Sequence, residues 1–253
     1  MSRRSRLLLF ACAGPGLLAV LLIGLHGLPA FGDFHGAYGL LVDRIEPGKR
    51  HATDIVTALN FDLRAFDTLG EEFILFASVS AVALLLRHLR DEDDGAQPSR
   101  SQSDHRFAGA SDATRVLSLI LIPLLVSLGV YLALHGALTP GGGFQAGVVL
   151  AAGPLVILLA GRYLALKRVA PRWALDVLDA AGATAYALIG LGGLIFASVY
   201  LENFLPLGTS GHLLSAGMMP LNSIAVGLEV TGAFLLTWTE FLDQDLLVER
   251  GEL

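Results

Sequence analysis

A glycine-rich stretch, TPGGGFQAG at 139–147, separates two long apolar runs of the chain. Relative to alanine, a proline costs about 3 kcal/mol and a glycine about 1 kcal/mol in a helix interior, so a break in the backbone is expected here. At membrane depth, freed N–H and C=O groups must be satisfied by protein or by trapped water. The stretch therefore predicts a buried junction that serves as a packing element or lines a pathway. Its residues are Pro140, Gly141, Gly142, Gly143, Phe144, Gln145 and Gly147.

The composition indicates a membrane protein. The mean hydropathy is +0.64, and 54% of the residues are hydrophobic while only 16% are charged, against about 25% charged residues in soluble domains. A helix needs about 20 residues to cross the hydrocarbon core. We expect an all-α, polytopic fold with about six transmembrane helices, and the run at 73–86 reaches that length only if the polar segment 67–72 continues its helix. The predicted spans are 7–28, 73–86, 116–134, 147–166, 177–200 and 221–241.

The basic residues predict the orientation of these spans. With the N-terminus inside, 13 of the 17 Lys and Arg residues fall in inner segments, as the positive-inside rule requires. Both termini are then expected to be cytoplasmic, and we expect a multi-pass protein of a cell membrane. The first apolar run is too long for a typical signal peptide and no A-x-A site follows it, so we expect a retained helix.

A polar segment divides the chain into two predicted modules. Residues 91–112 are rich in Ser, Asp and Gly, which is typical of a flexible linker, here on the cytoplasmic side. Residues 1–90 form a two-span N-terminal module in this scheme. Residues 113–253 form a four-span module.

A charged segment, NFDLRAFDTLGEEF at 60–73, leads directly into the second predicted span. Ionisable groups cost roughly 2.5–3.5 kcal/mol each at the bilayer centre, so they require partners or water. One interpretation is an ion or proton passage, or a charged contact with a neighbouring protein of a complex. The other is a helix cap, because Thr68 and Glu71 have the spacing of a capping box with Thr68 as the N-cap. The candidate ion-pathway residues of this segment are Asp62, Arg64, Asp67, Thr68, Glu71 and Glu72.

Glu229 is a further candidate for the ion pathway, because it lies in the middle of the last apolar run. A carboxyl group at that depth is expected to face the protein interior, where it could carry a proton. The alternative is a neutral group that joins helices through hydrogen bonds. Thr231 and Asn222 are then its nearest candidates.

Motifs for other kinds of chemistry are missing from the sequence. It contains no HExxH, G-x-S-x-G or CxxC pattern, and the glycine run has neither the strand context of a dinucleotide site nor the GK[ST] of a P-loop. Cys12 is the single cysteine, which excludes a disulfide within the chain. We therefore expect no catalytic site, no cofactor, no metal site and no nucleic-acid partner.

Two stretches resemble known families. HGALTPGGGFQAGVVLAAG, at 135–153, resembles the signature of the MnhB/MrpB family, the B-type subunits of Mrp-type Na⁺/H⁺ antiporters, although His135 and Gly136 stand in the reverse of the usual order. FDLRAFDTLGEE, at 61–72, resembles a run in the C-terminal tail of the large A-type subunits of these antiporters and in the E-type subunits of membrane-bound hydrogenases, with Ala65 in place of the usual glycine.

The resemblance implies an integral membrane subunit of a multi-subunit monovalent cation (Na⁺)/proton antiporter. Such a protein contributes to assembly and to the ion pathway, its partners are the other membrane subunits, and Na⁺ and H⁺ are the transported ions. The alternative is a structural membrane-arm subunit of a hydrogenase or respiratory complex that couples redox chemistry to ion translocation. An independent solute carrier is a weaker third interpretation, because carriers usually have paired halves, whereas the two halves here do not match.

Overall fold

A computed structural model describes residues 3–28, 30, 32, 36–92, 110–160 and 163–251, except for the side chains of 3–6, 9, 87–92 and 244–251. The chain divides into two compact units, residues 1–41 and 42–253, which are treated separately. Helix α1 (Arg3–His26) belongs to the first unit, and its apolar side chains are exposed. Helix α2 (Ala37–Lys49) crosses the boundary between the units.

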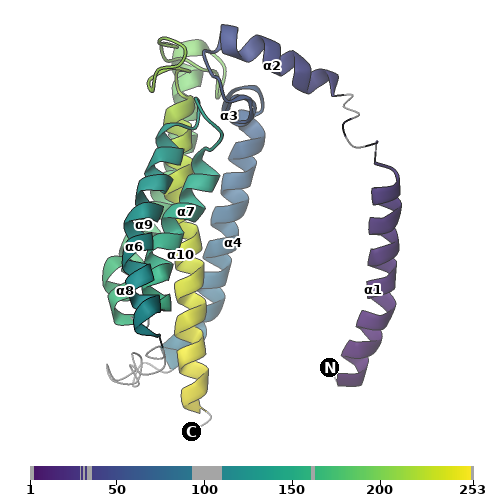
Figure 1. Cartoon of the computed structure of the whole chain (residues 1–253), viewed down its shortest axis with the longest axis vertical. Helices are drawn as coiled ribbons and strands as arrows, with labels where there is room; N and C mark the ends of the chain where they lie inside the picture. The colour runs from purple at the N-terminus through teal and green to yellow at the C-terminus, as the bar shows by residue number, and fades with distance from the viewer. Residues whose placement is uncertain are drawn as a thin grey trace. The chain divides into compact units, whose positions relative to one another are not determined.

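The second unit is a bundle of roughly aligned helices around α10 (Figure 1). Helix α10 packs against α4, α7 and α9, and 67% of its membrane segment is buried, compared with 11% of that of α4. Glycines at the contacts of α10 with α7 and α9 allow this central position, because small residues let helices approach closely. After α2, the elements are α3 (Ile55–Ala58), the π-helix η1 (Leu59–Leu63), α4 (Ala65–Glu92), α6 (Asp112–Leu134), α7 (Gly143–Leu159), α8 (Tyr163–Val169), α9 (Arg172–Ala197) and α10 (Met219–Gly251).

The helices agree with the predicted polytopic all-α class. Among the described residues, four helices are long and apolar enough to cross a membrane, and two shorter apolar helices, Phe10–His26 and Gly143–Leu159, match the remaining predicted spans. The four long segments are Ala65–Leu86, Asp112–Leu134, Arg172–Ala197 and Met219–Asp243.

The second predicted span reaches a membrane-crossing length, because the polar segment before it continues its helix. The polar segment 67–72 is helical and extends the apolar run back to Ala65, which gives a segment of 22 residues. Its polar side chains divide between two environments, because Glu72 is buried whereas Asp67 and Glu71 are exposed.

The span predicted at 147–166 is wrong at both ends. Helix α7 begins at Gly143 and ends at Leu159, and α8 is a separate helix. Glycines are accommodated in this first turn because α10 packs closely against Gly143 and Gly147, where a side chain would clash. Most of the predicted linker at 91–112 lies outside the described residues.

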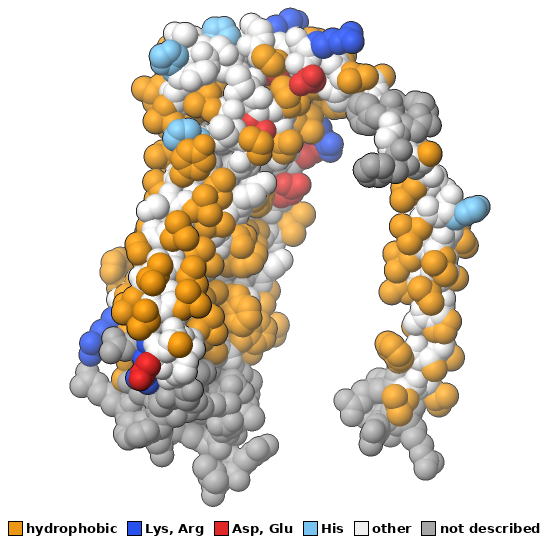
Figure 2. Space-filling view, in the orientation of Figure 1, with side chains coloured by type: hydrophobic (Ala, Val, Ile, Leu, Met, Phe, Trp, Pro, Cys, Tyr) orange, Lys and Arg blue, Asp and Glu red, His pale blue; other side chains and the backbone are white. Residues whose placement is uncertain are grey.

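Apolar side chains cover the visible side of this helical bundle, while charged side chains gather toward its ends (Figure 2). Arg44 and Lys49 belong to α2, Arg50 follows that helix and Arg64 directly precedes α4, whereas Arg115, Lys167, Arg168 and Arg172 lie at or near the starts of α6 and α9. We call the end where α4, α7 and α10 begin the outer end, following the orientation predicted from the sequence. The opposite end is the inner end.

Candidate functional site

Three carboxyl side chains from three helices lie in the interior of the second unit. Glu72 of α4, Asp179 of α9 and Glu229 of α10 are 1%, 3% and 0% exposed. The carboxyl groups of Glu72 and Glu229 are within electrostatic reach of each other, on helices that pack together. Asp179 is within electrostatic reach of both. We call these three residues the acidic centre.

The acidic centre has almost no protein groups to stabilise negative charge. The four carboxyl oxygens of Glu72 and Glu229, and Oδ1 of Asp179, have no hydrogen-bond partner among the described groups. No described Lys or Arg forms an ion pair with any of the three. Uncompensated buried charge costs several kcal/mol per ion. Neighbouring carboxyl groups in such surroundings therefore hold a proton, or admit a cation or water.

Two glycines bring α9 and α10 close enough to form this centre. A β-carbon at Gly182 of α9 would lie 2.6 Å from the β-carbon of Glu229, and one at Gly232 of α10 would lie 2.6 Å from the backbone nitrogen of Asp179. Each acid thus precedes a glycine by three positions, and that glycine packs against the acid of the other helix. Small residues permit such close approach of membrane helices.

On the outer side of the acidic centre, the start of α4 is tied to its surroundings by two hydroxyl groups. The hydroxyl of Tyr186, a fully buried side chain of α9, donates to the carbonyl of Ala65 at 2.9 Å. The hydroxyl of Thr68 donates to the carbonyl of Asn60, in the π-helix η1, at 2.8 Å.

These contacts overturn the predicted capping box. Thr68 is not an N-cap, because α4 begins three residues earlier, at Ala65, and Thr68 is helical. Its hydroxyl binds a carbonyl of the preceding π-helix instead of an amide of its own helix. The irregular hydrogen bonding of η1 allows this contact, and sequence spacing alone does not reveal a π-helix.

Three of the predicted candidates lie on the surface instead of at the acidic centre. Arg64 and Asp67 form an exposed ion pair, with the Nε of Arg64 2.5 Å from the Oδ2 of Asp67. Glu71 is also exposed. In the charged segment, Glu72 therefore faces the interior, whereas Asp67 and Glu71 face outward, because they occupy different positions around the same helix.

Asp62 belongs to a separate ionic cluster at the outer end. Its side chain is 4% exposed and lies 2.8 Å from the Nε of Arg50, which also contacts Glu202 at 3.1 Å. Burial raises the pKa of Asp62, although the attraction of Arg50 opposes that rise. Burial and the neighbouring Asp62 likewise raise the pKa of Glu46, which is buried beside them.

The glycine-rich junction breaks the backbone over a shorter stretch than predicted. Helix α6 ends at Leu134 and α7 begins at Gly143, so the second half of TPGGGFQAG is helical. Gly142 precedes that helix at a φ of 109°, a conformation that glycine adopts without strain. Phe144 packs against the core and Gln145 is exposed. Pro140 and Gly141 lie in the turn.

The tight contacts of this junction are with α10 of the same chain. A β-carbon at Gly143 would come 2.5 Å from the carbonyl oxygen of Ser223, and one at Gly147 would come 2.5 Å from the β-carbon of Val230. At Gly142 the nearest atom would be the Oγ1 of Thr57, at 3.4 Å. A close backbone contact is therefore a property of Gly143 and Gly147, whereas Gly142 is required for its φ.

Protein groups bind the backbone of the turn that leads from α6 into the junction. The backbone nitrogens of Thr53 and Asp54 donate to the carbonyl of Ala137 at 3.0 and 3.2 Å. The hydroxyl of Thr53 donates to the carbonyl of Leu138 at 2.6 Å. The segment before α3 and the turn after α6 thus form a hydrogen-bonded seam.

The hydrogen-bond partners predicted for Glu229 do not bind it. The hydroxyl of Thr231 donates to the carbonyl of Gly227 at 2.6 Å. Both polar side-chain atoms of Asn222 are buried without a partner. Sequence reasoning also missed Asp179, Tyr186, Arg50 and Glu202, of which Asp179 has the clearest signal, because it lies within an apolar helix.

Comparison with known proteins identifies the class of this chain. A family model described as a domain related to the MnhB subunit of Na⁺/H⁺ antiporter matches residues 113–236. An uncharacterized protein of Methanocaldococcus jannaschii is 31% identical over 229 residues, which are 79% of this chain and 86% of the relative. A protein of Rhizobium meliloti described as a probable K⁺/H⁺ antiporter A/B subunit is 29% identical over 123 residues, 43% of this chain but only 12% of that relative.

Two solved structures share the fold. A chain of the Mrp complex from Dietzia superposes with a TM-score of 0.70 at 21% identity, over 95% of this chain and 26% of that longer chain. A chain of the membrane-bound sulfane sulfur reductase, an archaeal respiratory membrane complex, superposes with a TM-score of 0.67 at 25% identity, over 96% of this chain and 99% of that chain. The family match and the archaeal relative, which aligns over 79% of this chain, show that the chain belongs to the family of membrane proteins related to the MnhB subunit of Na⁺/H⁺ antiporters.

Proposed function

We propose that this chain is an integral membrane subunit of a multi-subunit monovalent cation/proton antiporter, and that Glu72 and Glu229 belong to its ion pathway. The observation that carries the proposal is the presence of these two buried carboxyl groups, without hydrogen-bond partners, on the packed helices α4 and α10 and within electrostatic reach of each other. The antiporter relatives supply the class of complex. The other membrane subunits of that complex are its partners.

A carboxyl pair of this kind suits exchange chemistry. Each oxygen can accept a proton or coordinate a monovalent cation, and no hydrogen bond from outside the cluster has to be broken when either arrives. Binding one positive charge removes the cost of burying the negative one. Proton and cation therefore compete for the same oxygens, which is the requirement for coupled exchange. We infer a transport function instead of catalysis.

The glycine contacts supply the second part of the proposed function, which is assembly. Gly143 and Gly147 hold α7 against α10, and Gly182 and Gly232 hold α9 against α10. These contacts fix the bundle that carries the acidic centre. The exposed apolar faces of α4, α6 and α9 remain for lipid or partner subunits.

The alternative is a structural subunit in the membrane arm of a respiratory complex. This alternative is favoured because the present chain superposes on 99% of a chain of the membrane-bound sulfane sulfur reductase. The two functions predict different companions. A tagged chain, isolated from native membranes in mild detergent, should bring antiporter subunits in the first case and redox subunits in the second.

The experiment for the ion pathway compares Glu72→Gln and Glu229→Gln with Glu71→Gln. Exchange is measured in everted membrane vesicles as Na⁺-dependent or K⁺-dependent dissipation of a pH gradient, and assembly is checked by isolating the tagged complex. We expect at least a tenfold loss of exchange in the first two variants, because an amide cannot take up a proton. The control should retain exchange, since Glu71 is the exposed neighbour of Glu72. Full exchange by both buried variants would refute the assignment.

A further inference from the structure

Asp179 is the member of the acidic centre that connects it toward the inner end. Asp179 is electrostatically linked to Glu72 and Glu229 on one side and to Asp176 on the other. Asp176 and Asp179 are three positions apart on α9, so their side chains are neighbours on the helix surface. Asp176 is exposed and lies 3.7 Å from the Nε of Arg172, at the inner start of the helix. One turn of α9 therefore joins a buried acid to an acid on the surface.

The direction of this step follows from the course of α9. The helix begins at Arg172, at the inner end, and Asp176 and Asp179 lie about 6 and 10 Å along its axis from there at a rise of 1.5 Å per residue. Glu229 lies farther toward the outer end, because Gly232, three residues later on α10, packs against the backbone of Asp179. The acids are thus arranged in the order Glu229, Asp179 and Asp176 toward the inner surface.

The burial of Asp179 lacks an explanation in terms of packing or helix capping alone. Asp179 lies within α9 and not at either end of it. The residue is 3% exposed, and its Oδ1 has no hydrogen-bond partner. The groups that face it are the carboxyls of Glu229 on α10, Glu72 on α4 and Asp176 on its own helix. All of these groups are acids. An ionised Asp179 beside them therefore needs a mobile positive charge, such as a proton.

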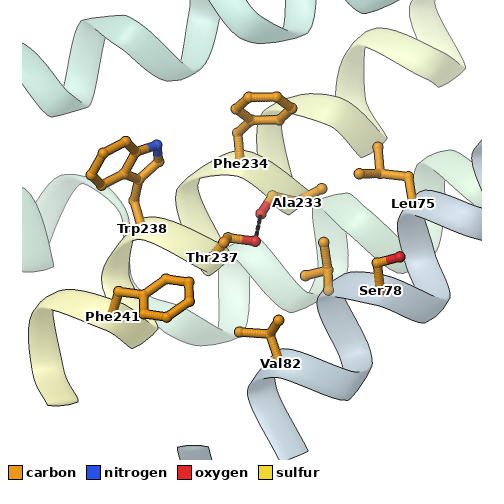
Figure 3. Close-up of a pocket in the computed structure, with 9 residues that line it drawn as sticks. Leu75, Ser78, Val82, Ala233, Phe234, Thr237, Trp238 and Phe241 are labelled. Carbon is orange, nitrogen blue, oxygen red and sulfur yellow. Dashed lines mark hydrogen bonds between the residues drawn. The ribbon is translucent and has the colours of Figure 1, made fainter. Parts of the chain in front are cut away.

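The other opening near the acidic centre is unsuited to ions. A cavity of about 490 Å³ lies between α4 and α10 on the inner side of the pair, and its wall is formed largely by apolar side chains (Figure 3). Trp238, Phe234 and Phe241 come from α10, and Val79 and Val82 come from α4. The hydroxyls of Ser78 and Thr237 donate within their own helices, to the carbonyls of Ile74 at 2.7 Å and Ala233 at 2.8 Å. A proton leaving through this cavity would meet these two hydroxyl groups but no carboxylate among the lining residues.

We propose that Asp179 and Asp176 form the inner proton exit of the acidic centre. In each step a proton leaves a carboxylic acid and binds the carboxylate of the next residue, from the Glu72–Glu229 pair to Asp179 and from Asp179 to Asp176, and the reverse sequence loads the pair from the inner side. The proposal rests on the proposed function of that pair. It adds a route on α9 that the apolar cavity cannot provide.

The test is the proton flux of Asp179→Asn and Asp176→Asn in everted vesicles, whose inner membrane face is turned to the medium. Asp179→Asn keeps the size of the side chain and should reduce cation-driven proton flux at least tenfold in an assembled complex. Asp176→Asn should assemble normally because the residue is exposed, and should move the dependence of the rate on medium pH. Asp67→Asn, an exposed acid at the outer end, is the control and should change neither quantity.

The possible outcomes distinguish a failure of the proposed proton exit from a failure of the proposed ion pathway. Normal flux in Asp179→Asn together with loss of flux in Glu72→Gln and Glu229→Gln would overturn the exit and leave the proposed function standing. Normal flux in all three variants would overturn both. If Asp179→Asn does not assemble, the surface variant decides, and a pH dependence like that of the wild type in Asp176→Asn then refutes the exit.

Discussion

Gly182 of α9 lies directly against the backbone of Glu229 on α10, so that a β-carbon at position 182 would clash with the Glu229 backbone nitrogen and lie 2.6 Å from the carbonyl oxygen of Ala225. The neighbouring atoms belong mainly to the helix backbone, which cannot rotate away as a flexible side chain can. The position of Glu229 is therefore set by the absence of a side chain on another helix.

We predict that Gly182→Ala destabilises the protein by about 1–3 kcal/mol, the usual cost of overpacking a close contact. The apparent Tm of the detergent-solubilised protein should fall. Gly70→Ala is a matched control, because Gly70 is also helical but no atom lies within 4 Å of its added β-carbon. There alanine should be neutral or slightly stabilising. An equal Tm for the two variants would contradict the close packing of α9 and α10.

Arg50→Ala should destabilise the outer end in a pH-dependent manner. Burial raises the pKa of Asp62, and the charge and hydrogen bond of Arg50 hold that rise in check. Loss of Arg50 raises this pKa further, and it acts in the same direction on Glu46. Glu202 adds repulsion to Asp62. At pH 8 the buried carboxylate is then ionised without its partner, at a cost of about 1–3 kcal/mol.

The sign of the pH effect follows from proton binding. The folded variant binds a proton at Asp62 more tightly than the unfolded chain does, so its stability increases as pH falls through the raised pKa toward the ordinary value. The Tm deficit of Arg50→Ala relative to wild type should therefore be largest at pH 8 and shrink in acid. Arg50→Ala combined with Asp62→Asn should lose much of this dependence. A constant deficit across pH would show that Arg50 acts through packing alone.

Thr68 and Glu71 should behave as unrelated residues. In a capping box, both side chains bind backbone amides of the same helix start, and removing either costs a similar free energy. In the structure the hydroxyl of Thr68 instead donates to the Asn60 carbonyl, and Glu71 is exposed. Thr68→Val should thus cost about 1 kcal/mol, whereas Glu71→Ala should leave the Tm nearly unchanged. Equal losses would restore the capping interpretation.

Much of the helical architecture could be predicted because long apolar runs have few alternatives in a membrane. The residues at which the helices start and end were harder to predict. Gly143 begins a helix because α10 offers a surface that fits a residue without a side chain, and that surface comes from a distant part of the chain. The π-helix η1 has the composition of an ordinary helix, so its extra residue and the hydrogen bond to Thr68 could not be foreseen.

The acidic centre was predictable only in part. Glu72 and Glu229 could be singled out because each is a carboxyl group in or beside an apolar run, but their proximity depends on how α4 and α10 pack. Asp179 could have been found from periodicity. It shares the buried face of α9 with Gly182, Tyr186, Gly190 and Gly193, at spacings of three and four residues.

The hydrogen-bonded seam of Thr53 and Asp54 with Ala137 joins two parts of the chain that are far apart in the sequence. Residues before the 93–109 segment supply α4 and one side of the seam, and residues after it supply α6 to α10 and the other side. Hydrogen bonds and helix packing join these parts without using the peptide chain between them. We therefore predict that two separate polypeptides, divided within 93–109, would still associate through these contacts.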